Sequence, residues 1–150
     1  MGGQACVFYG AAQVSKDIDF VLFANTENFR RLHNAMSELK AECITVPRFD
    51  PSALARGHAV HFRCQAPGVA GLRIDLMTRL RGLSDFETLW DRRTSFADDA
   101  GHEFNLLCIP DLVIAKKRSV ARIGPSLNSW LPSIIAKTQI LRAKIGFNSG

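Results

Sequence analysis

Three aspartates lie within two segments that otherwise have the pattern of β-strands. Asp17 and Asp19 belong to DIDFVLF, residues 17–23, whose β-branched and aromatic residues favour a strand. Asp75 belongs to LRIDLM, residues 72–77, in which apolar and polar residues alternate. Successive side chains of a strand point to opposite faces, so each segment has one face that carries aspartate and one apolar face. The apolar faces are predicted to pack into a core.

These carboxylates have the chemistry of a metal site. If the two strands lie side by side with their polar faces together, three carboxylates converge and repel one another unless cations are bound. Mg²⁺ takes carboxylate oxygens and keeps water or phosphate oxygens in its remaining positions. Two such ions about 4 Å apart clamp the attacking and leaving oxygens of a phosphoryl displacement. A single Asp-x-Asp is more often a solvated turn or strand end, so the prediction depends on its combination with Gly2-Gly3, a short helix and a third acid on another strand.

The rest of the chain alternates between helix and strand patterns. Helices are predicted over residues 4–9, over residues 26–41, after the capping box Ser84–Glu87, and over residues 110–117. Further strands are predicted over residues 43–46, 58–64 and 102–108. Alternating helices and strands predict an α/β or α+β domain with a mixed central sheet flanked by helices.

Length and composition point to one domain without a membrane segment. A chain of 150 residues is long enough for a core of its own. It has no apolar run of about 20 residues and no signal-peptide pattern, so a cytoplasmic protein with no membrane partner is predicted. The four cysteines have apolar neighbours and lack zinc-knuckle spacing, which favours buried, unreactive thiols over a zinc site.

The residues around the acids resemble a known signature. Gly2-Gly3 precedes the first predicted helix, and Ser15-Lys16 precedes Asp17-Ile18-Asp19. Together with LRID at 72–75 and PDLVIAK at 110–116, this pattern resembles the nucleotidyltransferase superfamily. The closest resemblance is to the bacterial AbiEii-type toxins and related nucleotidyltransferase-like proteins. It covers roughly residues 1–117 and implies a polymerase-β-like fold.

The resemblance assigns the acids to metal binding. Asp17 and Asp19 would bridge two Mg²⁺ ions, with Mn²⁺ as the alternative metal. Asp75 would complete the catalytic metal site and favour deprotonation of an acceptor hydroxyl. All three are therefore expected to be both metal ligands and catalytic residues.

The resemblance assigns other residues to the nucleotide. Gly2 and Gly3 would let the backbone approach the triphosphate, and Ser15 would hydrogen-bond a phosphate oxygen. Lys116 would neutralise charge that develops in the transition state. A lysine near a helix C-terminus also interacts favourably with the helix dipole, and this alternative stays open. His58 and His61, three apart on a predicted strand, face opposite sides and are predicted to be surface or rim residues.

The implied function is transfer of a nucleoside monophosphate from an NTP to a hydroxyl group of RNA or protein, with a cognate antitoxin as a partner. A second hypothesis is a catalytically inactive remnant of the same fold, or a binding module. A third is a protein that binds nucleic acid or a membrane through its basic tail. Salt-sensitive binding that is lost on deletion of the tail would support the third hypothesis.

The tail differs from the rest of the chain in charge. The net charge is +5, and the last acidic residue is Asp111. Five basic residues follow residue 117: Arg118, Arg122, Lys137, Arg142 and Lys144. A back-translation of residues 117–125, read from its third base, gives TQRGKDWP, which resembles the continuation expected of the family. Residues 118–150 are therefore predicted to be a poorly packed, non-native tail produced by a frameshift near Lys116-Lys117.

Overall fold

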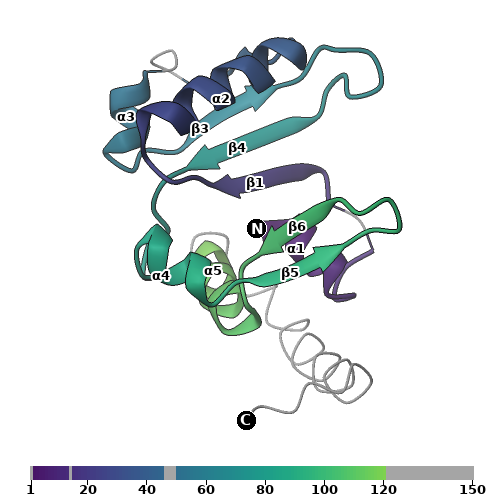
Figure 1. Cartoon of the computed structure of the whole chain (residues 1–150), viewed down its shortest axis with the longest axis vertical. Coiled ribbons are helices and arrows are strands. Elements are labelled where there is room, and N and C mark those ends of the chain that lie inside the picture. The colour runs from purple at the N-terminus through teal and green to yellow at the C-terminus, as the bar shows by residue number, and fades with distance from the viewer. Residues whose placement is uncertain (1, 14, 46–49, 121–150) are drawn as a thin grey trace.

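The chain forms a four-stranded sheet and a separate two-stranded hairpin, with helices around both (Figure 1). A computed structural model describes residues 2–13, 15–45 and 50–120. Its helices are α1 (Gly2–Phe8), α2 (Thr26–Glu38), α3 (Pro51–Ala55), α4 (Phe86–Asp91) and α5 (Ile109–Val120). Its strands are β1 (Asp17–Val21), β2 (Glu42–Cys43), β3 (Val60–Arg63), β4 (Arg73–Met77), β5 (Thr94–Ala97) and β6 (Glu103–Leu106).

The larger sheet has mixed strand directions. Its order is β1-β4-β3-β2, in which β1 is parallel to β4 while β3 is antiparallel to both β4 and β2. β5 and β6 form an antiparallel pair of their own. The prediction of a mixed sheet with several helices in an α+β arrangement is therefore confirmed.

One face of this sheet forms the first core. The buried members of this core come mainly from alternate positions of β3 and β4: Val60, Phe62, Ile74 and Leu76, together with Leu54 and Cys64. Helix α2 packs against them through Phe29, Leu32 and Met36, which recur at helical spacing. The side chain of Asn25 caps this helix by accepting a hydrogen bond from the amide of Asn28 at 2.7 Å.

A second core lies beyond the β1 edge of the sheet, among α1, α4, α5 and β6 (Figure 1). Tyr9, the residue after α1, is buried here, and its hydroxyl donates a hydrogen bond to the carbonyl of Leu107 at 2.8 Å. Arg92 donates two hydrogen bonds to the buried carboxylate of Asp111, at 2.6 and 2.9 Å. This ion pair fixes the start of α5 next to α4.

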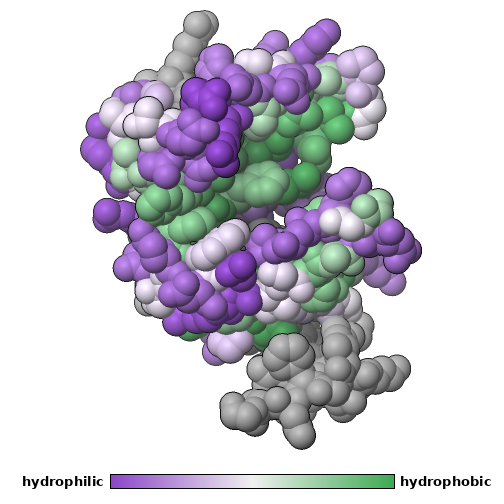
Figure 2. Space-filling model, in the orientation of Figure 1, coloured by the Kyte–Doolittle hydropathy of each residue, from purple (hydrophilic) through white to green (hydrophobic). Residues whose placement is uncertain are grey.

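Apolar surface crosses the middle of the molecule between the two cores (Figure 2). A groove there is lined by Phe20 and Val21 of β1 and by Phe86 and Trp90 of α4. Phe20 is 45% exposed and Trp90 43% exposed. In the described parts of the chain, no helix is long and apolar enough to cross a bilayer.

Several local predictions need correction. Helix α4 is capped by Asp85, whose carboxylate accepts from the amide of Thr88 at 3.0 Å, and the predicted cap Ser84 lies one residue earlier. Helix α3 and strand β5 are additional elements that the patterns did not predict. The expectations for the tail lie outside the described residues, except that 118–120 continue α5.

Candidate functional site

The strand register sets the three aspartates on one face of the sheet. In the parallel pair β1–β4, Asp17 lies beside Arg73 and Asp19 lies beside Asp75. Residues paired in this way point to the same side. That side is opposite the apolar core, because the intervening residues Ile74 and Leu76 are buried in it. Asp17, Asp19 and Asp75 together form a surface that we call the acid face.

The start of α1 packs closely against this face. A Cβ atom added to Gly2 would lie 1.7 Å from Oδ2 of Asp19, far inside van der Waals contact. Gly2 also has a φ of +67°, in the left-handed region that favours glycine. Only glycine satisfies both conditions, and the backbone of α1 consequently lies directly against the Asp19 carboxylate.

Gly3 has a similar relation to the loop before β1. Its added Cβ would lie 2.2 Å from Oγ of Ser15. The Ser15 hydroxyl lies 2.9 Å from the carbonyl oxygen of Asp17 and 3.2 Å from its Oδ1, and it can donate to either atom. The two glycines, Ser15 and the first two aspartates therefore form one compact group.

Charge and burial act together on Asp19. Its pKa is raised chiefly by burial, then by the negative charge of Asp17, with a further contribution from Asp75. Lys116 on α5 opposes this shift, so its ammonium group lies within the field of the acid face. Asp19 is thus a carboxyl group that a nearby cation would stabilise in its ionised form.

Asp75 is held by two basic side chains. It is only 7% exposed, and the Arg73 guanidinium donates to both of its oxygens, Nε to Oδ1 at 2.7 Å and Nη2 to Oδ2 at 3.0 Å. Nδ1 of His61 on β3 lies 2.8 Å from Oδ1 of Asp75 and 3.2 Å from Nη2 of Arg73. Protonated at Nδ1 the imidazole donates to Asp75, and without that proton it accepts from Arg73.

The carboxylate oxygens of the acid face are of the type that binds a hard divalent cation. Carboxylate oxygens on neighbouring strands are the ligands that Mg²⁺ prefers. As the side chains stand, no group of three or more His, Cys, Asp or Glu within the described residues converges to hold a metal ion. The partners of Asp75 are on β3 and β4, whereas Asp17 and Asp19 are on β1. Binding by all three acids therefore requires Asp75 to change partners.

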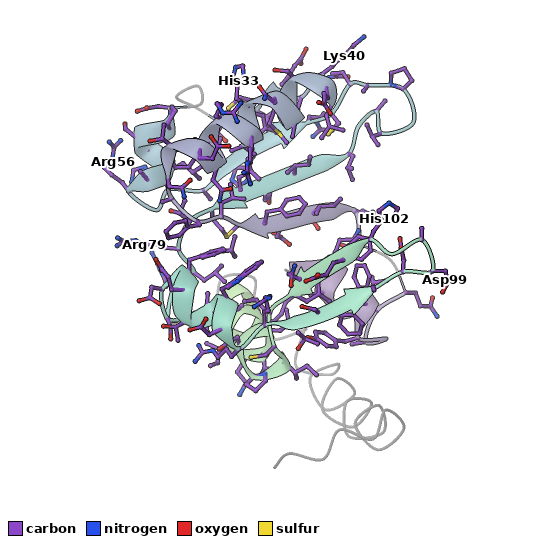
Figure 3. All side chains as sticks on the ribbon, viewed as in Figure 1. His33, Lys40, Arg56, Arg79, Asp99 and His102 are labelled. Atoms are coloured by element: carbon purple, nitrogen blue, oxygen red, sulfur yellow. The ribbon has the colours of Figure 1, made fainter. Side chains whose placement is uncertain are left out.

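Sequence reasoning missed two residues of this site. His61 was expected at the surface or rim, but it is half-buried and contacts Asp75. The pairing of His61 with Asp75 follows from the β3–β4 register, which strand patterns alone do not specify. Arg73 was assigned only to the polar side of its strand. By contrast, His33 of α2 and Lys40, two residues after the end of this helix, project away from the sheet (Figure 3).

The cysteines do not belong to the acid face. All four are free thiols, of which Cys6 and Cys64 are buried as predicted, while Cys43 and Cys108 are only partly buried. Burial raises the pKa of the Cys6 thiol, which keeps it protonated and unreactive at neutral pH.

No protein-family model, curated protein or solved structure matches the chain. The assignment of function consequently depends on the acid face itself. Its distinctive features are three carboxylates on adjacent strands, a glycine backbone packed against one of them, and a guanidinium bound to another.

Proposed function

We propose that this chain is a Mg²⁺-dependent nucleotidyltransferase of the polymerase-β-like fold. It transfers a nucleoside monophosphate from an NTP to a hydroxyl group of RNA or protein. The observation that carries the proposal is the β1–β4 register, which puts Asp17, Asp19 and Asp75 on one face. The close approach of Gly2 to Asp19 supports it, because it sets a backbone without a Cβ atom beside a proposed metal ligand.

The acids would hold the metal. Asp17, Asp19 and Asp75 supply the oxygen ligands for two Mg²⁺ ions, with Mn²⁺ as the alternative. When bound, these ions neutralise phosphate charge and orient the reacting oxygens. The raised pKa of Asp19 supports this assignment, because Asp17 and Asp75 both contribute to it and must lie near it.

The reaction is a substitution at phosphorus. The acceptor hydroxyl oxygen forms a bond to the α-phosphorus, and the bond from that phosphorus to the oxygen leading to the β-phosphate breaks. Pyrophosphate leaves, and the hydroxyl proton passes to a base, a transfer that Asp75 favours. Gly2, Gly3 and Ser15 would position the triphosphate, and Lys116 would neutralise charge that develops on it.

The arrangement around Asp75 favours a second candidate, a catalytically inactive member of the same fold that binds nucleotides. Arg73 and His61 both engage the carboxylate that the reaction needs. If that pairing is permanent, the acid face binds a nucleotide without turning it over. In either case the partners are an NTP and, by the resemblance to toxins, a cognate antitoxin.

Label transfer separates the two candidates. The full chain is incubated with Mg²⁺, each of the four α-³²P-labelled NTPs, and either total RNA or total protein as acceptor. A transferase moves label into one acceptor fraction, and Asp17→Asn abolishes the transfer while Asp99→Asn, an exposed acid on the β5–β6 turn, does not. Nucleotide binding without label transfer would favour the inactive candidate, and the absence of both would overturn the proposal.

A further inference from the structure

The ion pair between Arg73 and Asp75 joins two side chains on the same face of β4. Arg73 lies two residues before Asp75 on the same strand and beside Asp17 of β1. The Arg73 side chain remains 43% exposed although it binds Asp75, whose side chain is only 10% exposed. One side chain is thus both bound to a predicted metal ligand and accessible from solvent.

Arg73 is also within reach of the whole acid face. Its pKa is raised first by the hydrogen bonds to Asp75 and further by the charges of Asp75, Asp17 and Asp19. The guanidinium is therefore the basic group that balances the acid face when no other cation is there. A buried carboxylate needs such a partner, because an unpaired buried charge is strongly unfavourable.

A divalent cation and this guanidinium compete for the same oxygens. Both Oδ atoms of Asp75 already accept from Arg73. A metal ion bound by Asp75 would also repel the guanidinium across a few ångströms. A released arginine remains charged and presents planar paired donors, which match phosphate oxygens as well as they match a carboxylate.

We propose that Arg73 exchanges partners, from Asp75 in the metal-free protein to the triphosphate of the nucleotide in the loaded protein. This proposal rests on the proposed function. Before metal binds, Arg73 holds Asp75 and so lowers the affinity of the acid face for a metal ion. After metal and nucleotide bind, Arg73 contacts the triphosphate and raises the affinity for the nucleotide. Arg73 therefore makes metal binding depend on the nucleotide that accompanies it.

Arg63 offers a matched control. It lies beside Arg73 in the β3–β4 register, so it projects from the same side of the sheet. It is exposed and, within the described residues, takes part in no ion pair. Arg63→Gln removes the same charge from the same face without releasing Asp75.

The test measures Mn²⁺ binding by the electron paramagnetic resonance of the unbound ion. Wild type, Arg73→Gln, Arg73→Lys and Arg63→Gln are titrated with Mn²⁺ alone, and then with Mn²⁺ and the α,β-methylene analogues of ATP, GTP, CTP and UTP. Arg73→Gln is expected to bind Mn²⁺ alone at least about tenfold more tightly than wild type. Removing one nearby positive charge changes the affinity of a carboxylate for a proton by about this factor, and we expect a similar change in its affinity for a metal ion. Arg73→Gln should bind the Mn²⁺–nucleotide complex about tenfold more weakly than wild type. Arg73→Lys should lie between wild type and Arg73→Gln, and Arg63→Gln should be close to wild type.

The outcomes separate this inference from the proposed function. If wild type binds the Mn²⁺–nucleotide complex and Arg73→Gln has unchanged affinities, the exchange is wrong while the proposed function stands. A loss of both affinities in a folded Arg73→Gln variant would mean that Arg73 only supports Asp75, and would also overturn the exchange. If no variant binds Mn²⁺ with or without nucleotide, the proposed function fails and the exchange fails with it.

Discussion

The two faces of the four-stranded sheet are made from alternate residues of the same strands, but their contributions to stability differ in sign. On one face, Ile74 and Leu76 are almost fully buried beneath α2. On the other, Asp19 and Asp75 lie side by side, and their mutual repulsion contributes to the raised pKa of Asp19. Burial of the apolar face stabilises the fold, whereas the carboxylates of the acid face repel one another and destabilise the fold unless cations lie nearby.

This difference separates the residues that build the fold from those that serve the site. Burial of apolar area is the largest favourable contribution to folding, so the apolar face tolerates few changes. Like charges on adjacent strands oppose folding, and a protein keeps them where they bind something. Under the proposed function the acid face is the functional side of the sheet, and substitutions on the two faces should have different signatures.

The largest expected effect is on the apolar face. Leu76→Ala removes a side chain that is 1% exposed and should lower the free energy of unfolding by about 2–5 kcal/mol. Met77→Ala, the next residue and on the opposite side, should cost about 1 kcal/mol or less, because Met77 is only half-buried. Urea denaturation measures both, and similar losses would contradict the division between the faces.

Gly2→Ala should have a smaller effect on stability and a large effect on the site. The left-handed φ should cost about 1–2 kcal/mol, and the new methyl group displaces the Asp19 carboxylate. Gly68→Ala is the control, because Gly68 also has a positive φ, +84°, but an added Cβ there meets nothing within 4 Å. Gly2→Ala should lose at least as much stability as Gly68→Ala by urea denaturation, and only Gly2→Ala should lose Mn²⁺–nucleotide binding. Loss of binding in both would contradict the close approach of α1 to the acid face.

Asp19→Asn should stabilise the metal-free protein at pH 7, by a few tenths to about 1 kcal/mol. The folded-state pKa of Asp19 lies above its ordinary value of 3.8, so the folded protein holds this proton more tightly than the unfolded chain does. The penalty in wild type is therefore absent below the ordinary value of 3.8, grows as pH rises through the folded-state pKa, and is complete above that pKa. Thermal melting of both proteins from pH 3 to pH 7 measures this difference, and destabilisation by Asp19→Asn at pH 7 would contradict it.

Much of the frame of the site was predictable from sequence. The alternation in residues 17–23 and 72–77 gave two strands with correctly assigned faces, and the spacing of Phe29, Leu32 and Met36 gave α2. Strand β5 was missed because it has a single large apolar residue, Phe96, between charged segments. Helix α3 has only five residues, too few for a periodic pattern.

The partners of the acids were not predictable in the same way. Alternation predicts which face a residue occupies but not its register with a neighbouring strand. The pairing of His61 with Asp75 follows from the β3–β4 register, which the order of residues does not specify by itself. The bidentate contact of Arg73 with Asp75 depends on side-chain rotamers, which strand periodicity leaves open.

The most direct test of the central claim is thermal melting of wild type with and without Mg²⁺ and each of the four NTPs. A ligand that binds only the folded state, at about 100 times its Kd, adds about 2.7 kcal/mol, which is roughly 10 °C in melting temperature for a domain of this size. The account predicts such a rise for wild type and none for Asp19→Asn, which remains folded without its metal-binding charge. An equal rise in the two proteins, or no rise in wild type with any NTP, would contradict the assignment of the acid face as a metal–nucleotide site.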